Sequence, residues 1–155
     1  MISVQYREAT ASDVPEMARS RLTDAEAGPA DGRMAAYLEG THHPQRALPP
    51  RTAYVALADE AVVAYIAGHL TRRFGCDGEV QYLYVAPQYR RRGMGGQLLL
   101  LQASWFGGRG AARICVNVDP ANGGARAFYE HHGATELRHA WYVWTDMGAL
   151  VGGAG

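Results

Sequence analysis

The segment Arg90–Gly96, which reads Arg-Arg-Arg-Gly-Met-Gly-Gly, constrains this chain more than any other feature. It lies between a β-rich run, Glu79–Ala86, and a helical run, Gly95–Phe106. A strand, a glycine loop and a helix N-terminus together form an anion site, because free backbone N–H groups converge there and the helix dipole favours negative charge. A diphosphate suits such a loop better than a monophosphate. A tight strand–helix turn with a solvated arginine rim would explain the same residues, and the loop alone does not decide between the two.

Two familiar nucleotide-binding fingerprints do not fit this loop. It matches neither G-x-x-x-x-G-K-[ST] nor G-x-G-x-x-G. All 15 basic residues are arginine, which excludes a P-loop lysine and Schiff-base chemistry. A Rossmann site also needs an early parallel βαβ unit, whereas the short connections before this loop predict an antiparallel meander.

Composition predicts one globular domain over residues 1–155, since 48% of the residues are hydrophobic and 19% are charged. A formal net charge of zero argues against nucleic acid as a partner. The sequence shows neither a bilayer-spanning run nor a signal-peptide start, so we expect no membrane partner and a cytoplasmic location. Its histidines and its thiols, Cys76 and Cys115, offer no close-spaced ligand set, and we predict no metal.

The order of apolar periodicities predicts a mixed α/β (α+β) fold with the element sequence β-α-α-β-β-β-α-β-α-β-β. The expected strands are Ser3–Arg7, Thr52–Ala58, Ala61–Arg73, Glu79–Ala86, Arg113–Val118, Thr135–Arg138 and Trp141–Asp146. The expected helices are Asp13–Ala25, Arg33–Glu39, Gly95–Phe106 and Ala125–His132. Proline-rich Thr41–Arg51 is predicted to be a loop and Val151–Gly155 a fraying tail.

Two stretches carry a resemblance to a known family. Gln81–Leu99 resembles the acyl-CoA motif of the GNAT (GCN5-related) N-acetyltransferase superfamily, whose core Gln/Arg-x-x-Gly-x-Gly/Ala is met by Arg90, Gly93 and Gly95. Downstream, Asn122–Ala134 resembles the second motif of the family, with its Asn and its Phe-Tyr pair in order. The six-residue core is weak by itself, but the apolar strand before it and the Asn…Phe-Tyr helix after it make the resemblance specific. The element order extends it over nearly the whole chain.

The resemblance implies a mixed, mostly antiparallel sheet of six to seven strands, splayed between the fourth and fifth strands and flanked by about four helices. It implies acetyl-CoA as cosubstrate. The backbone of Leu83, Tyr84 and Val85 would bond the acetyl carbonyl and the pantetheine amides in place of a neighbouring strand. The other residues implied to bind acetyl-CoA are Arg90, Arg91, Arg92, Gly93, Met94, Gly95 and Gly96 at the diphosphate, Asn122 near the pantetheine or at a helix cap, and Tyr129. Which arginine reaches the ribose phosphate stays open, and Gly96, often larger in relatives, is expected to matter little.

The resemblance also implies two catalytic residues. Glu79 matches the glutamate that some GNAT enzymes use as general base, directly or through water; otherwise it starts a strand and points to solvent. Tyr129 matches the tyrosine that faces the CoA sulfur and is the candidate general acid; otherwise it is a core aromatic. His69 follows Gly68, where a bulge could aim it into the cleft, but a surface position is the favoured interpretation.

The predicted function is therefore an acetyl-CoA-dependent N-acetyltransferase that acts on a primary amine, in a small molecule or a peptide, by direct transfer in a ternary complex. A non-catalytic acyl-CoA-binding or sensing module is the alternative, and a nucleic-acid-binding domain built on Arg90–Arg92 is disfavoured by the zero net charge. A homodimer is left open. Acceptor specificity is expected to lie in Arg21–Arg51, Arg72–Gly78 and Trp141–Trp144.

Overall fold

The computed structural model describes residues 3–22, 32–44 and 46–152. The strands are β1 Val4–Glu8, β2 Ala47–Ala58, β3 Ala61–Thr71, β4 Gly78–Val85, β5 Ile114–Asn117, β6 Thr135–Arg138 and β7 Trp141–Trp144. The α-helices are α1 Val14–Leu22, α2 Gly32–Glu39, α3 Met94–Gly108, α4 Gly123–His131 and α5 Gly148–Gly152. The predicted α/β fold and its element order are confirmed.

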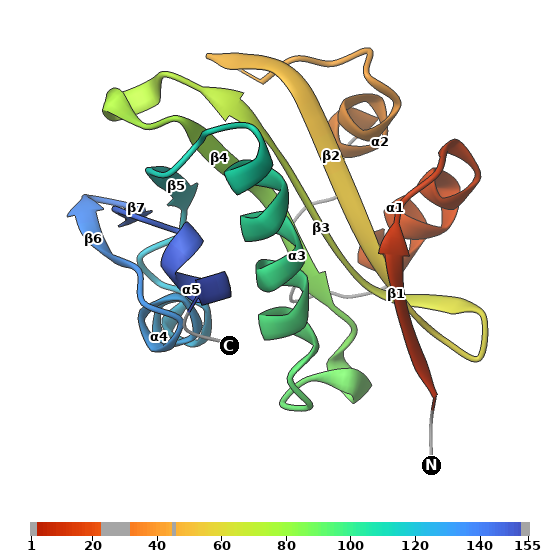
Figure 1. Cartoon of the computed structure of the whole chain (residues 1–155). Helices are drawn as coiled ribbons and strands as arrows, with labels where there is room; N and C mark the ends of the chain where they lie inside the picture. Colours follow the sequence, from red (N-terminus) through yellow and green to blue (C-terminus); the bar gives the residue numbers. More distant parts are fainter. Residues whose placement is uncertain (1–2, 23–31, 45, 153–155) are drawn as a thin grey trace.

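The strands form one seven-stranded sheet in the order β1-β2-β3-β4-β5-β7-β6 (Figure 1). Each neighbouring pair is antiparallel except β4 and β5, which are parallel. A parallel pair needs a crossover connection, and α3 supplies it. The meander from β2 to β4 and the crossover through α3 are thus both as the sequence predicts.

The sheet opens where β4 and β5 part. The two strands pair only over Gly78–Val80 and Ile114–Val116. On its other side β4 stays paired with β3 as far as Val85. The predicted splay between the fourth and fifth strands is therefore confirmed, and it begins after Val80.

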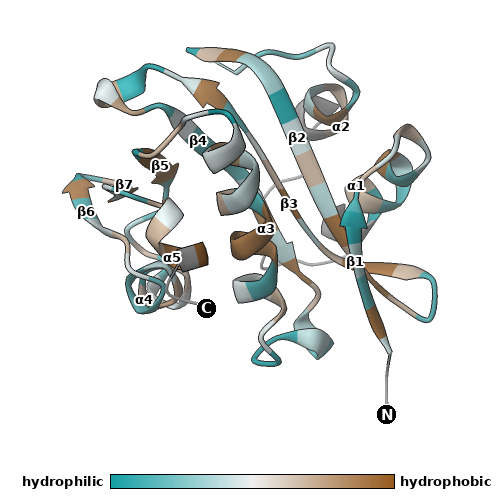
Figure 2. Ribbon diagram, viewed as in Figure 1, coloured by the Kyte–Doolittle hydropathy of each residue, from teal (hydrophilic) through white to brown (hydrophobic). Residues whose placement is uncertain are grey.

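Helices cover both faces of the sheet. On one face, Leu98 and Phe106 of α3 share a buried cluster with Ile66 of β3. On the other face, Met17 of α1 packs with Tyr65 of β3 in a second cluster. Figure 2 shows hydrophobic residues in brown on β5 and on a segment of α3. Side chains on the two faces of β4 therefore enter two different environments.

The predicted loop over Thr41–Arg51 is wrong in its second half, because β2 begins at Ala47. Pro49 and Pro50 lie within this strand, where the register with β3 shifts between Leu48 and Arg51. Proline lacks the N–H that a central strand needs, so it is normally confined to edges and bulges. Here β1 pairs with β2 only over Tyr54–Ala58, and the prolines disturb no pairing on that side.

The structure tests the prediction for the end of the chain but not the one for the end of the first helix. That helix is predicted to run to Ala25, and residues 23–31 lie outside the described residues. The tail expected over Val151–Gly155 is wrong for Val151 and Gly152, which belong to α5. Among the described residues, no helix is long and apolar enough to cross a membrane.

Candidate active site

A bulge in β4 decides which way the candidate base points. The register with β3 pairs Ala67 with Tyr82 and Gly68 with Val80, so Gln81 is an extra residue in β4. One inserted residue reverses the alternation of all later side chains. Val80 belongs to the cluster on the α3 face, whereas Tyr82 packs against Tyr37 of α2 with 5.4 Å between ring centroids.

Gly68 makes room for this bulge. A Cβ on Gly68 would lie 2.8 Å from the backbone oxygen of Glu79 and 3.0 Å from Nε2 of Gln102 in α3. Both distances are shorter than ordinary van der Waals contact, so a larger residue would force the strands and α3 apart. The close approach of β3, β4 and α3 therefore depends on glycine at this position.

Glu79 is buried on the α1 and α2 side of β4, with 4% of its surface exposed. The Nε of Arg73 donates to Oε1 of Glu79 at 3.2 Å, and Nε2 of His69 lies 3.6 Å from the same oxygen. A buried carboxylate is costly unless it is paired, and Arg73 provides that partner. The alternative in which Glu79 starts a strand and points to solvent is wrong.

His69 is fully buried, so its interpretation as a surface histidine is wrong. Its Nδ1 lies 2.9 Å from the hydroxyl of Tyr37 in α2. Burial raises the pKa of Tyr37, so the phenol stays protonated. The signal in the sequence was the long apolar run of β3: a strand buried on both faces has no solvent-facing position for a histidine.

Tyr129 of α4 belongs to the buried cluster on the α3 side of the sheet. Its ring contacts Phe128 and Trp144 edge to face, with centroids 5.3 and 5.7 Å apart. Burial raises the pKa of Tyr129, and its hydroxyl makes no hydrogen bond with the described residues. The phenol therefore keeps its proton as a donor, and it lies on the opposite face of the sheet from Glu79.

The glycine loop leads from β4 into α3 through the short 3-10 helix Pro87–Tyr89. Gly93 precedes the helix with φ at +82°, in the left-handed region that favours glycine. The first helical hydrogen bond runs from the amide of Gln97 to the carbonyl of Gly93. The amides of Met94, Gly95 and Gly96 have no acceptor inside the helix and point out of its N-terminus.

Gly95 and Gly96 also lie at a close contact between two helices. A Cβ on Gly95 would lie 2.9 Å from the ring of Phe128, and one on Gly96 would lie 2.9 Å from Cε1 of His132. These glycines therefore let α3 pack closely against α4. A side chain on Gly96 would require the ring of His132 to shift.

The three loop arginines differ in their surroundings. The Nε of Arg90 donates to the carbonyl of Val85 at 2.8 Å, which ties the loop to the end of β4. The guanidinium of Arg92 lies 5.5 Å from the ring centroid of Tyr89. Arg91 is exposed with φ at +63°.

Asn122 caps α4. Its Oδ1 accepts from the amide of Ala125 at 3.0 Å. The helix cap expected for this residue is therefore present. An Asn at this position satisfies a backbone donor that the helix cannot satisfy itself.

Comparison with known families agrees with this geometry. A model described as the acetyltransferase (GNAT) family matches residues 17–134, a range that holds the open edge of β4, the glycine loop and Tyr129. The chain belongs to the GNAT acetyltransferase family. No curated protein sequence matches it.

Solved GNAT structures share the fold at low sequence identity. An aminoglycoside N-acetyltransferase in complex with CoA gives a TM-score of 0.73 at 18% identity, covering 89% of this chain and 91% of that one. The PaiA N-acetyltransferase of Thermoplasma acidophilum, also in complex with CoA, gives 0.67 at 15%, covering 91% and 96%. The ribosomal-protein-S18-alanine N-acetyltransferase of Escherichia coli gives 0.67 at 18%, covering 91% of each chain.

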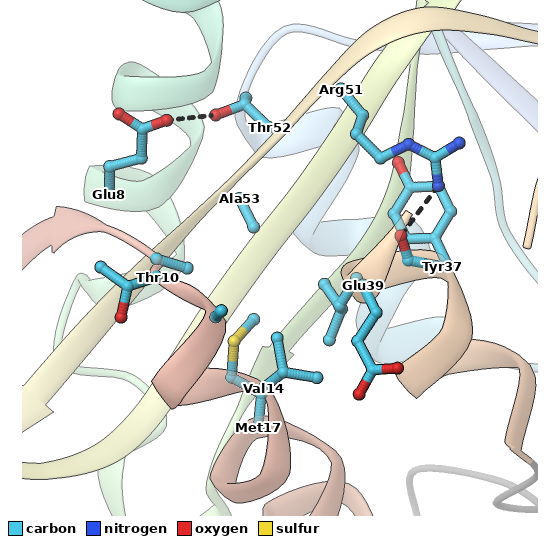
Figure 3. Close-up of a pocket in the computed structure, with 12 residues that line it drawn as sticks. Glu8, Thr10, Val14, Met17, Tyr37, Glu39, Arg51, Thr52 and Ala53 are labelled. Carbon is cyan, nitrogen blue, oxygen red and sulfur yellow. Dashed lines mark hydrogen bonds between the residues drawn. The ribbon is translucent and has the colours of Figure 1, made fainter. Parts of the chain in front are cut away.

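The GNAT domain has a pocket of about 290 Å³ on the α1 and α2 face (Figure 3). It is lined by Glu8, Ala9, Thr10, Ala11, Val14, Met17, Tyr37, Leu38, Glu39, Arg51, Thr52 and Ala53. In Figure 3, Glu8 and Tyr37 lie on opposite sides of this pocket. Nη1 of Arg51 donates to the carbonyls of Tyr37 and His42, so its charge ties β2 to α2. Tyr37 and Glu39 come from the segment expected to set acceptor specificity.

Of the two other segments expected to contact the acceptor, the β3–β4 turn contacts only one end of β7. The guanidinium of Arg73 lies 4.9 Å from the ring centroid of Trp141, which joins the β3–β4 turn to β7. Trp144 does not share this surface, because it is buried on the α3 face beside Tyr129. Its Nε1 donates to the carbonyl of His132 at 2.9 Å, which fixes the end of α4.

Proposed function

We propose that this GNAT protein transfers an acetyl group from acetyl-CoA to a primary amine by direct transfer in a ternary complex. The observation that carries the proposal is the position of Glu79. This buried carboxylate lies one residue before Val80, where the pairing of β4 with β5 ends. A base at the start of an opening in the sheet can reach a nucleophile that meets the thioester there.

The residues at the α3 side fit acetyl-CoA. The amides of Met94, Gly95 and Gly96 at the start of a 15-residue helix suit the diphosphate, and Arg91 and Arg92 add positive charge beside them. We propose that β4 beyond Val80, through Leu83 and Tyr84, binds the pantetheine and the acetyl carbonyl as an added strand would. The carbonyl of Val85 already accepts from Arg90 and contributes less. The exposed Asn122 shapes this side by capping α4.

Acetyl-CoA supplies the acetyl group. Two side chains on opposite faces of the sheet, Glu79 and Tyr129, transfer the protons. Glu79 takes one proton from the acceptor ammonium, which frees the nitrogen lone pair to form the new C–N bond. Tyr129 gives its proton to the sulfur as the C–S bond breaks, and is reprotonated by the second proton lost from nitrogen. The products are an amide, CoA thiol and one proton released through Glu79.

The acceptor in this proposal approaches from the α1 and α2 face, where the side chain of Glu79 lies. The carboxylates of Glu8 and Glu39 line the pocket on that face and suit a molecule with a second positive charge. The structural neighbours include enzymes named for an aminoglycoside and for a protein alanine. Small polyamines, aminoglycosides and peptides with a free N-terminus are therefore the acceptors to screen first.

The test is a screen of these amines for thiol release from acetyl-CoA, comparing the wild type with Glu79→Gln and Tyr129→Phe. Because the chain has no lysine, only its N-terminal amine can be acetylated in the background. We expect both variants to bind CoA and to lose turnover. Equal turnover in all three proteins would contradict the assigned roles, and CoA binding without turnover on any amine would favour the acyl-CoA-sensing alternative.

A further inference from the structure

One oxygen of the Glu79 carboxylate is held and the other is open. Arg73 donates to Oε1 at 3.2 Å, and His69 faces the same atom at 3.6 Å. Among the described residues, Oε2 has no hydrogen-bond partner. The carboxylate is therefore asymmetric, with one oxygen available to a substrate proton.

Two contacts favour hydrogen on Nε2 of His69. The hydroxyl of Tyr37 is 2.9 Å from Nδ1 and can donate its proton to a lone pair on that nitrogen. The hydrogen of the neutral imidazole is then on Nε2, where the N–H points toward Oε1 of Glu79. The other tautomer would set a lone pair against the carboxylate, which is electrostatically unfavourable.

The contact between His69 and Glu79 has room to shorten. At 3.6 Å it is too long for a hydrogen bond, and Nε2 is a buried polar atom without a hydrogen-bond partner among the described residues. The imidazole itself is fixed by burial and by the ring of Tyr37, whose centroid is 5.7 Å away. Hydrogen bonds in a substrate-free catalytic site are often long and tighten when the substrate binds.

We propose that His69, oriented by Tyr37, is a positioning residue for Glu79: its Nε2–H holds Oε1 so that Oε2 faces the amine of the acceptor. The inference rests on the proposed role of Glu79 as general base. In the proton-transfer step an N–H bond of the ammonium breaks and an O–H bond forms at Oε2. His69 keeps its own proton throughout, so no further reactant is needed.

Two substitutions of His69 separate this role from simple packing. In His69→Gln the side-chain amide nitrogen takes the place of Nε2 and can still donate to Glu79. In His69→Asn the amide takes the place of Nδ1, keeps a partner for Tyr37 and leaves Oε1 without that donor. Both variants place an amide in the same buried site, so each serves as the control for the other.

Kinetics use saturating acetyl-CoA and the amine from the screen that releases thiol fastest. We expect His69→Asn to lower kcat by about 10-fold or more and His69→Gln to stay within about 3-fold of the wild type, because misplacement of a catalytic group costs rate. The KM for acetyl-CoA should not change. In the Glu79→Gln background, His69→Asn should have no further effect, since the group that it positions is gone.

These results test the positioning role of His69 separately from the general-base role of Glu79. If Glu79→Gln is as active as the wild type, both roles are wrong. If Glu79→Gln is inactive but His69→Asn and His69→Gln have equal rates, only the positioning role is overturned.

A second measurement needs no acceptor, and its main result comes from the wild-type protein, so it holds even if a His69 variant folds poorly. In ¹⁵N-histidine-labelled wild type, NMR should show the Nε2-protonated tautomer for His69, assigned by loss of its signal in a His69 variant. Tyr37→Phe removes the donor to Nδ1 and should change that tautomer balance. A wild-type protein with hydrogen only on Nδ1 of His69 would overturn the inference.

Discussion

The candidate base and the candidate acid lie on opposite faces of the sheet and are held there by different means. On the α1 and α2 face, Glu79 is held by polar contacts to Arg73 and His69. On the α3 face, Tyr129 is held by the rings of Phe128 and Trp144. A group that must gain a proton is surrounded by donors on one of its oxygens, and a group that must keep one is buried among hydrocarbon. Substitutions on the α1 and α2 face should therefore change activity through electrostatics, and those on the α3 face should change it through packing.

The largest expected effect is on turnover, where the two faces should respond differently to pH. Both Glu79→Gln and Tyr129→Phe should lower kcat by roughly 100-fold or more, as loss of a general base or acid typically does. Raising the pH supplies neutral amine from solution, so it should restore part of the rate of Glu79→Gln. Tyr129→Phe should gain less, because its missing proton donor acts on the sulfur. Rate–pH profiles from pH 6 to about 10 would measure this, and identical profiles would contradict the division of roles.

Packing on the α3 face should be sensitive at Gly95, at the contact between α3 and α4. Gly95→Ala places a methyl group against Phe128, and we expect a loss of about 1–3 kcal/mol in the free energy of unfolding and weaker CoA binding. The control in the same helix is Gly107→Ala, where a Cβ meets nothing within 4 Å. That change should leave stability equal or raise it by about 0.5 kcal/mol. Urea unfolding and CoA titration of both variants measure the contrast.

A second substitution, at Phe128, tests whether the collision with Gly95→Ala causes the loss. If the methyl group collides with Phe128, adding Phe128→Leu should restore part of the stability and of the CoA affinity. A double variant that is weaker than Gly95→Ala in both measurements would show that the collision is not the cause.

A smaller effect is expected at Gly93, where backbone conformation rather than packing requires glycine. Its φ is +82°, and a Cβ there meets nothing within 4 Å. Gly93→Ala should cost about 1 kcal/mol of unfolding free energy through left-handed strain. CoA affinity should fall with it, because the strain acts on the loop that leads into α3. Gly93→Asn, which tolerates this conformation better, should lose less in both measurements.

The smallest effect on stability should come from an ion pair away from the opening between β4 and β5. Arg7 binds Asp13 through two hydrogen bonds of 2.7 and 3.0 Å, which lower the pKa of Asp13 from 3.8 to about 2. A carboxyl with a lowered pKa stabilises the folded state above pH 4, and that contribution is lost as the pH falls from about 4 toward 2. Arg7→Gln should therefore lower the thermal midpoint slightly at pH 7, with a smaller difference near pH 3. Turnover at pH 7 should be unchanged, and a loss of turnover would mean that the pair acts on the site.

Much of this architecture could be predicted from the sequence because glycines indicate turns and helix ends and apolar runs indicate buried strands and helices. The Arg90–Gly96 loop and the crossover helix after it follow from such patterns, whereas the opening of the sheet is expected only from the resemblance to the GNAT family. The direction of Glu79 could not be predicted, because strict alternation would group it with Gln81 and not with Tyr82. Only the register with β3 shows that Gln81 is an inserted residue.

Two further differences have the same origin in tertiary contacts. The sequence favours a surface position for His69 because a lone histidine usually lies there, and its partner Tyr37 is 32 residues away along the chain. The loop pattern predicts that Gly95 lets a ligand approach the backbone, but it does not predict the contact with Phe128, which lies in a helix that the sequence predicts but cannot position.

The prolines of β2 have a consequence for the behaviour of the protein in concentrated solution. Because β1 pairs with β2 only over Tyr54–Ala58, Ala47–Arg51 has no strand partner on that side among the described residues, and a strand of another molecule could add there. Pro49 and Pro50 have no N–H to donate to an added strand, which makes this stretch a poor template. Replacing both with valine should promote self-association, visible as light scattering that grows with protein concentration.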